Sequence, residues 1–183
     1  MNRLKGLRVM LSGGMDMVAD HGAGWRSELK SWLWEKGVGV FDPCVKPIEK
    51  GEEIESKAMR DGLIERKDWR TLKATMKIIR QIDLRMVTLA DFVVVYLSSE
   101  EKTCGTWEEL AVACAQKKPI IVIYKEGRKR APHWLIAQVP SQLIFSSFAE
   151  AKKYLTHIDE DEVIDDLGKW IFFDYTKLYK ETI

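Results

Sequence analysis

Two acidic residues of this sequence, Glu109 and Asp83, have surroundings that suit carboxylate chemistry. Glu109 lies in the segment Gly-Thr-Trp-Glu-Glu-Leu (105–110), soon after a strongly apolar run. Asp83 lies in Ile-Asp-Leu (82–84), on the inward side of an otherwise apolar helical stripe. A buried carboxylate must be paired, hydrogen-bonded or facing a cavity. Two such groups at one site could provide a nucleophile and a proton donor.

Each carboxylate also has a purely structural interpretation. Thr106 and Glu109 have the spacing of a capping box, in which both side chains satisfy free amides at a helix start. Asp83 could be a surface carboxylate paired with Arg80. Helical periodicity places Glu109 off the apolar face, which is formed by Trp107, Leu110, Ala111 and Cys114.

Small and polar residues follow the predicted strands, where they could contact a substrate. Ligands of open parallel sheets bind beyond the carboxyl ends of the strands. The candidate substrate-binding residues there are Ser12, Gly13, Gly14, Asp42, Ser98, Ser99, Gly105 and Thr106. Hydroxyls and backbone amides of this kind can hold an anion, with the basic segment 125–130 as possible support, so we expect a phosphate-bearing substrate.

The elements that must position these residues alternate between strand and helix. Strands are predicted at 7–11, 38–41, 92–97, 119–124 and 143–145, and helices at 25–36, 52–66, 68–89, 106–117 and 148–155. The runs 92–97 and 119–124 lack polar alternation, which is typical of parallel strands buried on both faces. We therefore expect an α/β fold with a doubly wound, mostly parallel, flavodoxin-like sheet of five strands.

The whole chain, 1–183, is predicted to form a single domain. Its core spans about 7–155, and an acidic stretch leads into a helical tail, about 156–183, that contains Trp170. Trp25, Trp32 and Trp34 are interpreted as core residues. The tryptophan content is nevertheless more than one small domain can readily bury, which favours homo-oligomerisation.

Composition excludes several classes of protein. The net charge of +1 gives no overall attraction to nucleic acid. Three cysteines without C-x-x-C spacing and three scattered histidines indicate neither a disulfide framework nor a metal site. The longest apolar run is too short to span a bilayer, and no signal peptide is recognised. A cytoplasmic protein without metal or cofactor is the expectation.

Four features in this order resemble the nucleoside 2-deoxyribosyltransferase superfamily. They are a first strand ending in Ser-Gly-Gly (12–14), a second ending in Asp-Pro (42–43), a helix with Asp-Leu (83–84) running into Ala-Asp and an apolar strand, and Gly-Thr-x-x-Glu-Leu (105–110) before a Lys-Pro strand (118–119). The resemblance covers roughly 7–155. It implies cleavage or transfer of the N-glycosidic bond of a nucleoside or its monophosphate, with Glu109 as nucleophile, Asp83 near the base, and a site near a subunit interface.

Two positions depart from the pattern of that family. Thr103 stands where many members have an acid, and Met10 stands where many have a tyrosine that orients the nucleophile. Glu100, Glu101 or Asp42 could replace the missing acid. The departures leave a catalytically inactive nucleotide-sensing module as one alternative. A phosphoribohydrolase of the lysine-decarboxylase-like type is another, although Lys-Thr-Cys (102–104) replaces its Pro-Gly-Gly.

Overall fold

A five-stranded parallel sheet forms the centre of the computed structural model, which describes residues 2–160 and 166–178. The strands are β1 (Arg8–Gly13), β2 (Gly39–Phe41), β3 (Phe92–Leu97), β4 (Ile120–Tyr124) and β5 (Ile144–Phe145). Their order is β2-β1-β3-β4-β5, and every neighbouring pair is parallel. This is the flavodoxin-like order, so the predicted fold class is confirmed.

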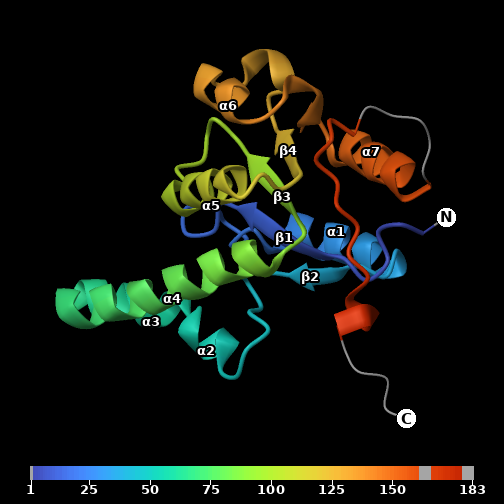
Figure 1. Cartoon of the computed structure of the whole chain (residues 1–183). Coiled ribbons are helices and arrows are strands. Elements are labelled where there is room, and N and C mark those ends of the chain that lie inside the picture. The colour runs from blue at the N-terminus through green and yellow to red at the C-terminus, as the bar shows by residue number, and fades with distance from the viewer. Residues whose placement is uncertain (1, 161–165, 179–183) are drawn as a thin grey trace, which may run out of the picture.

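Helices cover both faces of the sheet (Figure 1). One layer contains α1 (Ala23–Glu35) and α7 (Phe148–Glu160), which meet where the rings of Trp25 and Phe148 stack at 5.6 Å. The opposite layer contains α4 (Trp69–Leu89) and α5 (Cys104–Ala115), which pack against each other. Three shorter helices, α2 (Gly51–Ile54), α3 (Lys57–Glu65) and α6 (His133–Gln138), lie in the connections.

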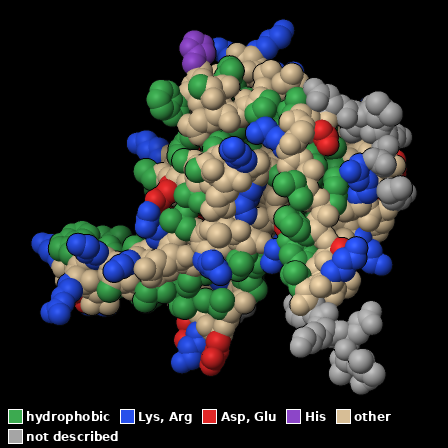
Figure 2. All heavy atoms as spheres, viewed as in Figure 1, with side chains coloured by type: hydrophobic (Ala, Val, Ile, Leu, Met, Phe, Trp, Pro, Cys, Tyr) green, Lys and Arg blue, Asp and Glu red, His purple; other side chains and the backbone are tan. Residues whose placement is uncertain are grey.

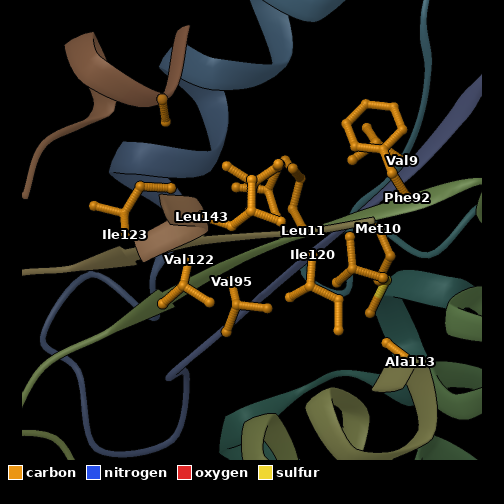
Figure 3. Close-up of a cluster of buried hydrophobic side chains, with 14 of the residues drawn as sticks. Val9, Met10, Leu11, Phe92, Val95, Ala113, Ile120, Val122, Ile123 and Leu143 are labelled. Carbon is orange, nitrogen blue, oxygen red and sulfur yellow. The ribbon is translucent and has the colours of Figure 1, made fainter. Parts of the chain in front are cut away.

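The core consists of the apolar strands and the helix faces that cover them. Strands β3 and β4 are almost completely buried, as their unbroken apolar sequence predicts. Figure 3 shows side chains from β1, β3 and β4 packed together, with Ala113 of α5 and Leu143 beside them. A sheet covered on both faces in this way is rigid, and its carboxyl edge can hold side chains in fixed positions.

Three local predictions are wrong. The predicted helix 52–66 is divided into α2 and α3, because Ser56 starts a new helix by accepting a hydrogen bond from Met59 N at 3.3 Å. Helix α6 lies in a segment predicted to be a loop. Trp34 is 57% exposed rather than in the core, with Lys30 Nζ 5.2 Å from its ring centroid.

The predicted C-terminal helix around Trp170 is also wrong. Residues 166–174 are not helical, and a single 3-10 turn follows at Tyr175–Leu178. Side-chain contacts fix this segment instead: Trp170 lies against Phe92 with 5.2 Å between ring centroids, and Tyr175 bonds to Asp91. Residues 161–165 and 179–183 of the predicted tail lie outside the described residues.

The helices in the described part of the chain are all too short or too polar to cross a membrane.

Candidate active site

Glu109 lies at the carboxyl edge of the sheet, in the second turn of α5. The helix begins at Cys104 with Thr103 at the capping position, so Thr106 and Glu109 both lie inside the helix. The capping-box interpretation is therefore wrong. The Glu109 side chain is 8% exposed and accepts a hydrogen bond from Ser12 Oγ at the end of β1. The predicted apolar face of this helix is also wrong. The sequence pattern places Glu109 off that face, but it belongs to the face that is buried.

The surroundings of Glu109 change its acidity. Burial raises the pKa of Glu109 to about 7, and the nearby negative charge of Asp83 contributes to the rise. The hydrogen bond from Ser12 and the positive charges of Arg26 and Lys46 act in the opposite direction. A carboxyl group with this pKa can be either ionised or protonated near neutral pH, which suits a group that reacts.

Asp83 on α4 is the second carboxylate of the site, and it is paired with a buried lysine. Lys46 Nζ lies 2.5 Å from Asp83 Oδ1 and 3.0 Å from Glu55 Oε2, and it also donates to Pro43 O at 3.1 Å. Burial raises the pKa of Asp83, while Lys46 lowers it. The proposed pairing with Arg80 is wrong, because Arg80 pairs with Glu108 on the surface.

Lys46 belongs to a chain of buried charges that continues away from Asp83. Its side chain is 0% exposed. Glu55 pairs next with Arg60 at 3.1 Å, and Arg60 reaches Asp16 at 2.7 Å. A buried charge is tolerated when it has a partner of opposite charge. This chain of ion pairs therefore fixes the position of Asp83.

A second buried cation, Arg26, shapes the turn after β1. Arg26 is fully buried and donates to Gly13 O and Gly22 O, both at 2.8 Å. Asp42 lies 4.0 Å from Arg26 and pairs with Lys30 at 3.0 Å. Gly13 is required here, because a Cβ would lie 2.9 Å from Cζ2 of Trp25. Asp42, for its part, balances the positive charges of Arg26 and Lys30.

Glu101 is the acid of the β3–α5 connection that lies closest to the turn after β1. A Cβ added to Gly14 would be 2.7 Å from Glu101 Oε2, so the carboxylate rests against the glycine backbone. Burial raises the pKa of Glu101. Glu100, by contrast, is paired with Lys125 at 2.6 Å. Of the acids considered as replacements for the acid missing at Thr103, Glu101 has the most suitable position.

Ser98 and Ser99 direct their donors onto one carboxylate. Glu126 Oε1 accepts from Ser98 Oγ at 2.9 Å, Ser99 Oγ at 3.0 Å and Ser99 N at 3.1 Å. The donors of the two serines therefore converge on one anionic group beyond β3, and their contact with a substrate stays a prediction. Lys125, in the basic segment 125–130, pairs with Glu100. Arg128 and Lys129 of the same segment line a groove that includes Phe145 and Tyr154.

The remaining predicted residues have different environments. Thr106 is 4% exposed within α5, whereas Gly105 is exposed and has open space where a Cβ would lie. Met10 is fully buried in the core. Thr103 Oγ1 is buried without a hydrogen-bond partner among the described residues.

Sequence reasoning missed the buried cations of the site, Lys46 and Arg26. Lys46 lies in a polar stretch that resembles a solvated loop, and Arg26 lies between apolar positions at the start of a helix. A single basic residue in such segments usually faces water. The signal that points to them is that Asp83, if it is buried, needs a cationic partner.

The fold and the site together define a flavodoxin-like α/β protein with a buried carboxylate of raised pKa at the carboxyl edge of its sheet. The family model for nucleoside 2-deoxyribosyltransferase matches residues 13–166, and the chain belongs to that family. A comparison with curated protein sequences finds no match.

Solved structures support the assignment of the fold. A 2-deoxyribosyltransferase from Leishmania mexicana has a TM-score of 0.56 and 18% identity, covering 86% of this chain and 99% of its own. A 2-deoxyribosyltransferase from Bacillus psychrosaccharolyticus has a TM-score of 0.54 and 17% identity, covering 90% and 96%. A CMP N-glycosidase from Clostridium botulinum has a TM-score of 0.44 and 19% identity, covering 84% and 98%. The support for the fold comes from the two 2-deoxyribosyltransferases, and at these identities their likeness to this chain concerns the fold alone.

Proposed function

We propose that this protein cleaves or transfers the N-glycosidic bond of a nucleoside or its 5′-monophosphate, with Glu109 as nucleophile. The observation that carries the proposal is the buried Glu109 carboxylate, which is oriented by Ser12 and has a pKa of about 7. Membership of the nucleoside 2-deoxyribosyltransferase family supports it. No metal or cofactor is required for this chemistry.

The proposed reaction follows the logic of retaining glycosidases. An oxygen of ionised Glu109 forms a bond to the anomeric carbon while the carbon–nitrogen bond breaks and its electron pair leaves with the base. Water, or the nitrogen of a second base, then attacks the same carbon and releases Glu109. Water gives hydrolysis and a second base gives transfer. Ser12 holds the attacking carboxylate in one orientation during both steps.

Asp83 is proposed to contact the base. Its bond to Lys46 fixes the position of the carboxylate. The departing nitrogen needs a proton, and the raised pKa of Asp83 favours an acid role. Glu101, whose pKa is also raised, is the second acid of this edge.

A 5′-monophosphate is the proposed substrate class. The support is the turn at Ser98 and Ser99, whose two hydroxyls and one amide already converge on an anionic group, Glu126. A substrate phosphate could replace that carboxylate and accept the same hydrogen bonds. Glu126→Gln weakens the internal competitor and should lower KM for monophosphates without lowering it for free nucleosides. Equal cleavage of nucleosides and monophosphates by the wild type would contradict this substrate class.

The decisive experiment compares three variants for release of free base from a panel of nucleosides and monophosphates. Glu109→Gln keeps the size of the side chain and can still accept from Ser12, so the fold should survive. Activity should fall by orders of magnitude, because the nucleophile is gone. Asp83→Asn should reduce activity while retaining substrate binding.

Glu108→Gln is the matched control for Glu109→Gln. It makes the same chemical change one residue earlier, at a side chain that is 39% exposed and paired with Arg80. It should leave turnover close to that of the wild type. Wild-type turnover in Glu109→Gln would disprove the mechanism. A wild-type protein that binds nucleotides but releases no base from any of them would indicate the sensing module instead.

A further inference from the structure

A groove of about 730 Å³ lies at the β5 edge of the sheet, between the turn that follows β4 and helix α7. Its volume is in the range of small-molecule sites, roughly 300–1,000 Å³. Ser12, Asp83 and Lys46, which surround Glu109, are all absent from its walls. The groove adjoins the turn at Ser98 and Ser99 through Glu126, but it does not include the carboxylates of the candidate active site.

The floor of the groove is apolar and fixed in place. It contains Ile144 and Phe145 of β5 and Tyr154 of α7. The rings of Phe145 and Tyr154 pack with 5.5 Å between their centroids, and the Tyr154 hydroxyl accepts a hydrogen bond from Trp170 Nε1 at 3.0 Å. These contacts hold a firm apolar surface on which the organic part of a ligand could rest.

Three cationic side chains, Arg128, Lys129 and Lys153, surround this floor. Arg128 uses its Nε to donate to Ile144 O at 3.0 Å, which leaves the two terminal nitrogens of the guanidinium for a ligand. Lys129 and Lys153 have neither a hydrogen bond nor an ion pair within residues 2–160 and 166–178. Arginine and lysine donors arranged in this way bind phosphate oxygens well.

The two acids that also line the groove are already engaged. Glu126 accepts hydrogen bonds from Ser98 and Ser99, and Glu150 accepts one from Ser146 N at 2.8 Å. Both carboxylates therefore already accept hydrogen bonds from the protein, Glu126 from Ser98 and Ser99 and Glu150 from Ser146 of the groove wall, whereas the cations have donors to spare. The balance of unsatisfied groups favours an anionic ligand.

Gly127 allows the wall of the groove to close against the end of β5. Its φ of +78° is in the region that favours glycine, and a Cβ would lie 3.0 Å from Ser146 Oγ. The turn that carries Arg128 and Lys129 therefore has a defined position rather than a free one.

We propose that this groove binds a small phosphorylated organic molecule, a nucleotide or a sugar phosphate, at a second site distinct from Glu109. The phosphate meets the three cations, and the organic part covers the apolar floor. The proposal goes beyond the proposed reaction and does not depend on it.

The test is calorimetric titration with adenosine 5′-monophosphate, ribose 5-phosphate, inorganic phosphate and adenosine. All proteins carry Glu109→Gln, so that no ligand is consumed. The double variant Lys129→Glu/Lys153→Glu reverses two charges of the groove. Its control, Lys5→Glu/Lys117→Glu, makes the same charge change on two exposed lysines that lie outside both the groove and helix α4. Because both proteins have identical residues around position 109, their difference isolates the groove.

The groove variant should bind at least one of the two phosphorylated organic ligands at least tenfold more weakly than the control. Stronger binding of adenosine 5′-monophosphate than of ribose 5-phosphate would show that the base ring rests on the apolar floor. Equal binding of the two would show that the sugar phosphate is sufficient. Equal affinities in the two double variants would overturn the proposal, as would a loss of adenosine or inorganic phosphate affinity in the groove variant as large as the loss for the organic phosphates. A failure of the proposed reaction would be seen separately, as absence of base release by the wild type.

Discussion

At the scale of single residues, the burial of Glu109 predicts that the proposed reaction depends on pH. The proposed nucleophile must be ionised, and burial raises its pKa to about 7. Base release should therefore increase with pH, with the acidic limb of kcat/KM centred near 7. Lys46→Met removes a positive charge that lowers the pKa of Glu109, so the limb should move to higher pH. An acidic limb centred near the pKa of an ordinary glutamate would contradict this assignment.

The same pKa predicts how stability depends on pH. Glu109 is raised from 4.5 to about 7 in the folded protein, so the folded state holds its proton more tightly. The contribution of Glu109 to the free energy of unfolding should be largest below about pH 4.5. It should decline by on the order of 3 kcal/mol as the pH rises to about 7. Urea titrations across this range should show a smaller decline in Glu109→Gln than in the wild type.

Lys46 is a residue whose loss should affect both stability and geometry. Lys46→Met leaves Asp83 and Glu55 without their common cation, and removing one partner of a buried pair costs about 3–5 kcal/mol. Lys57→Met is the control, because Lys57 and Asp61 form a surface pair with side chains 48% and 51% exposed. That change should cost less than about 1 kcal/mol. Similar losses of denaturation midpoint in the two variants would show that the buried network contributes little.

At the scale of elements, the non-helical segment 166–174 should contribute to stability through one side chain. Trp170 is 8% exposed and packs on Phe92. Trp170→Ala should lower the free energy of unfolding by about 3–5 kcal/mol, since it leaves a cavity against β3. Phe173→Ala is the control, because Phe173 is 56% exposed and should matter little. Thermal melting of both variants decides whether the segment is part of the folded unit.

The strands could be predicted from the sequence because a strand that is buried on both faces consists of apolar residues. The runs 92–97 and 119–124 are apolar at every position, and a strand with both faces covered has no other composition. The order of elements then leaves few topologies. The place of Ser98 and Ser99 at the carboxyl edge of the sheet could be predicted in the same way, because they directly follow β3, and Glu109 could be placed near that edge because it lies in the helix that follows.

Contacts between distant segments could not be predicted from the sequence. The partner of Asp83 is Lys46, 37 residues earlier, and no local pattern relates the two. Helix α5 buries Thr106, Glu109, Leu110 and Ala113, so the face that packs against the sheet is rotated from the predicted apolar face, and only packing with other elements decides this. Trp170 follows the same rule: its aromatic neighbours fit a helical pattern, but its partner Phe92 belongs to β3.

At the scale of the whole molecule, α3 and α4 form an arm that extends beyond the sheet (Figure 1). Figure 2 shows hydrophobic side chains gathered along this arm. The exposed ones are Met59 at 37%, Ile64 at 46%, Trp69 at 59% and Ile78 at 49%. Solvent-exposed apolar surface of this extent is typical of protein interaction sites. The arm begins close to Asp83, so a neighbouring subunit placed on it would approach the active site.

We predict that the arm joins identical subunits, and that Trp69→Glu separates them. A charge in the middle of an apolar interface would be buried without a partner. Sedimentation velocity should show an oligomer for the wild type and a lighter species for this variant. Trp134→Glu is the control, because Trp134 is 76% exposed on α6, away from the arm, and should leave the oligomer intact. If the wild type sediments as a monomer at high concentration, or if both variants dissociate equally, the arm is not the interface.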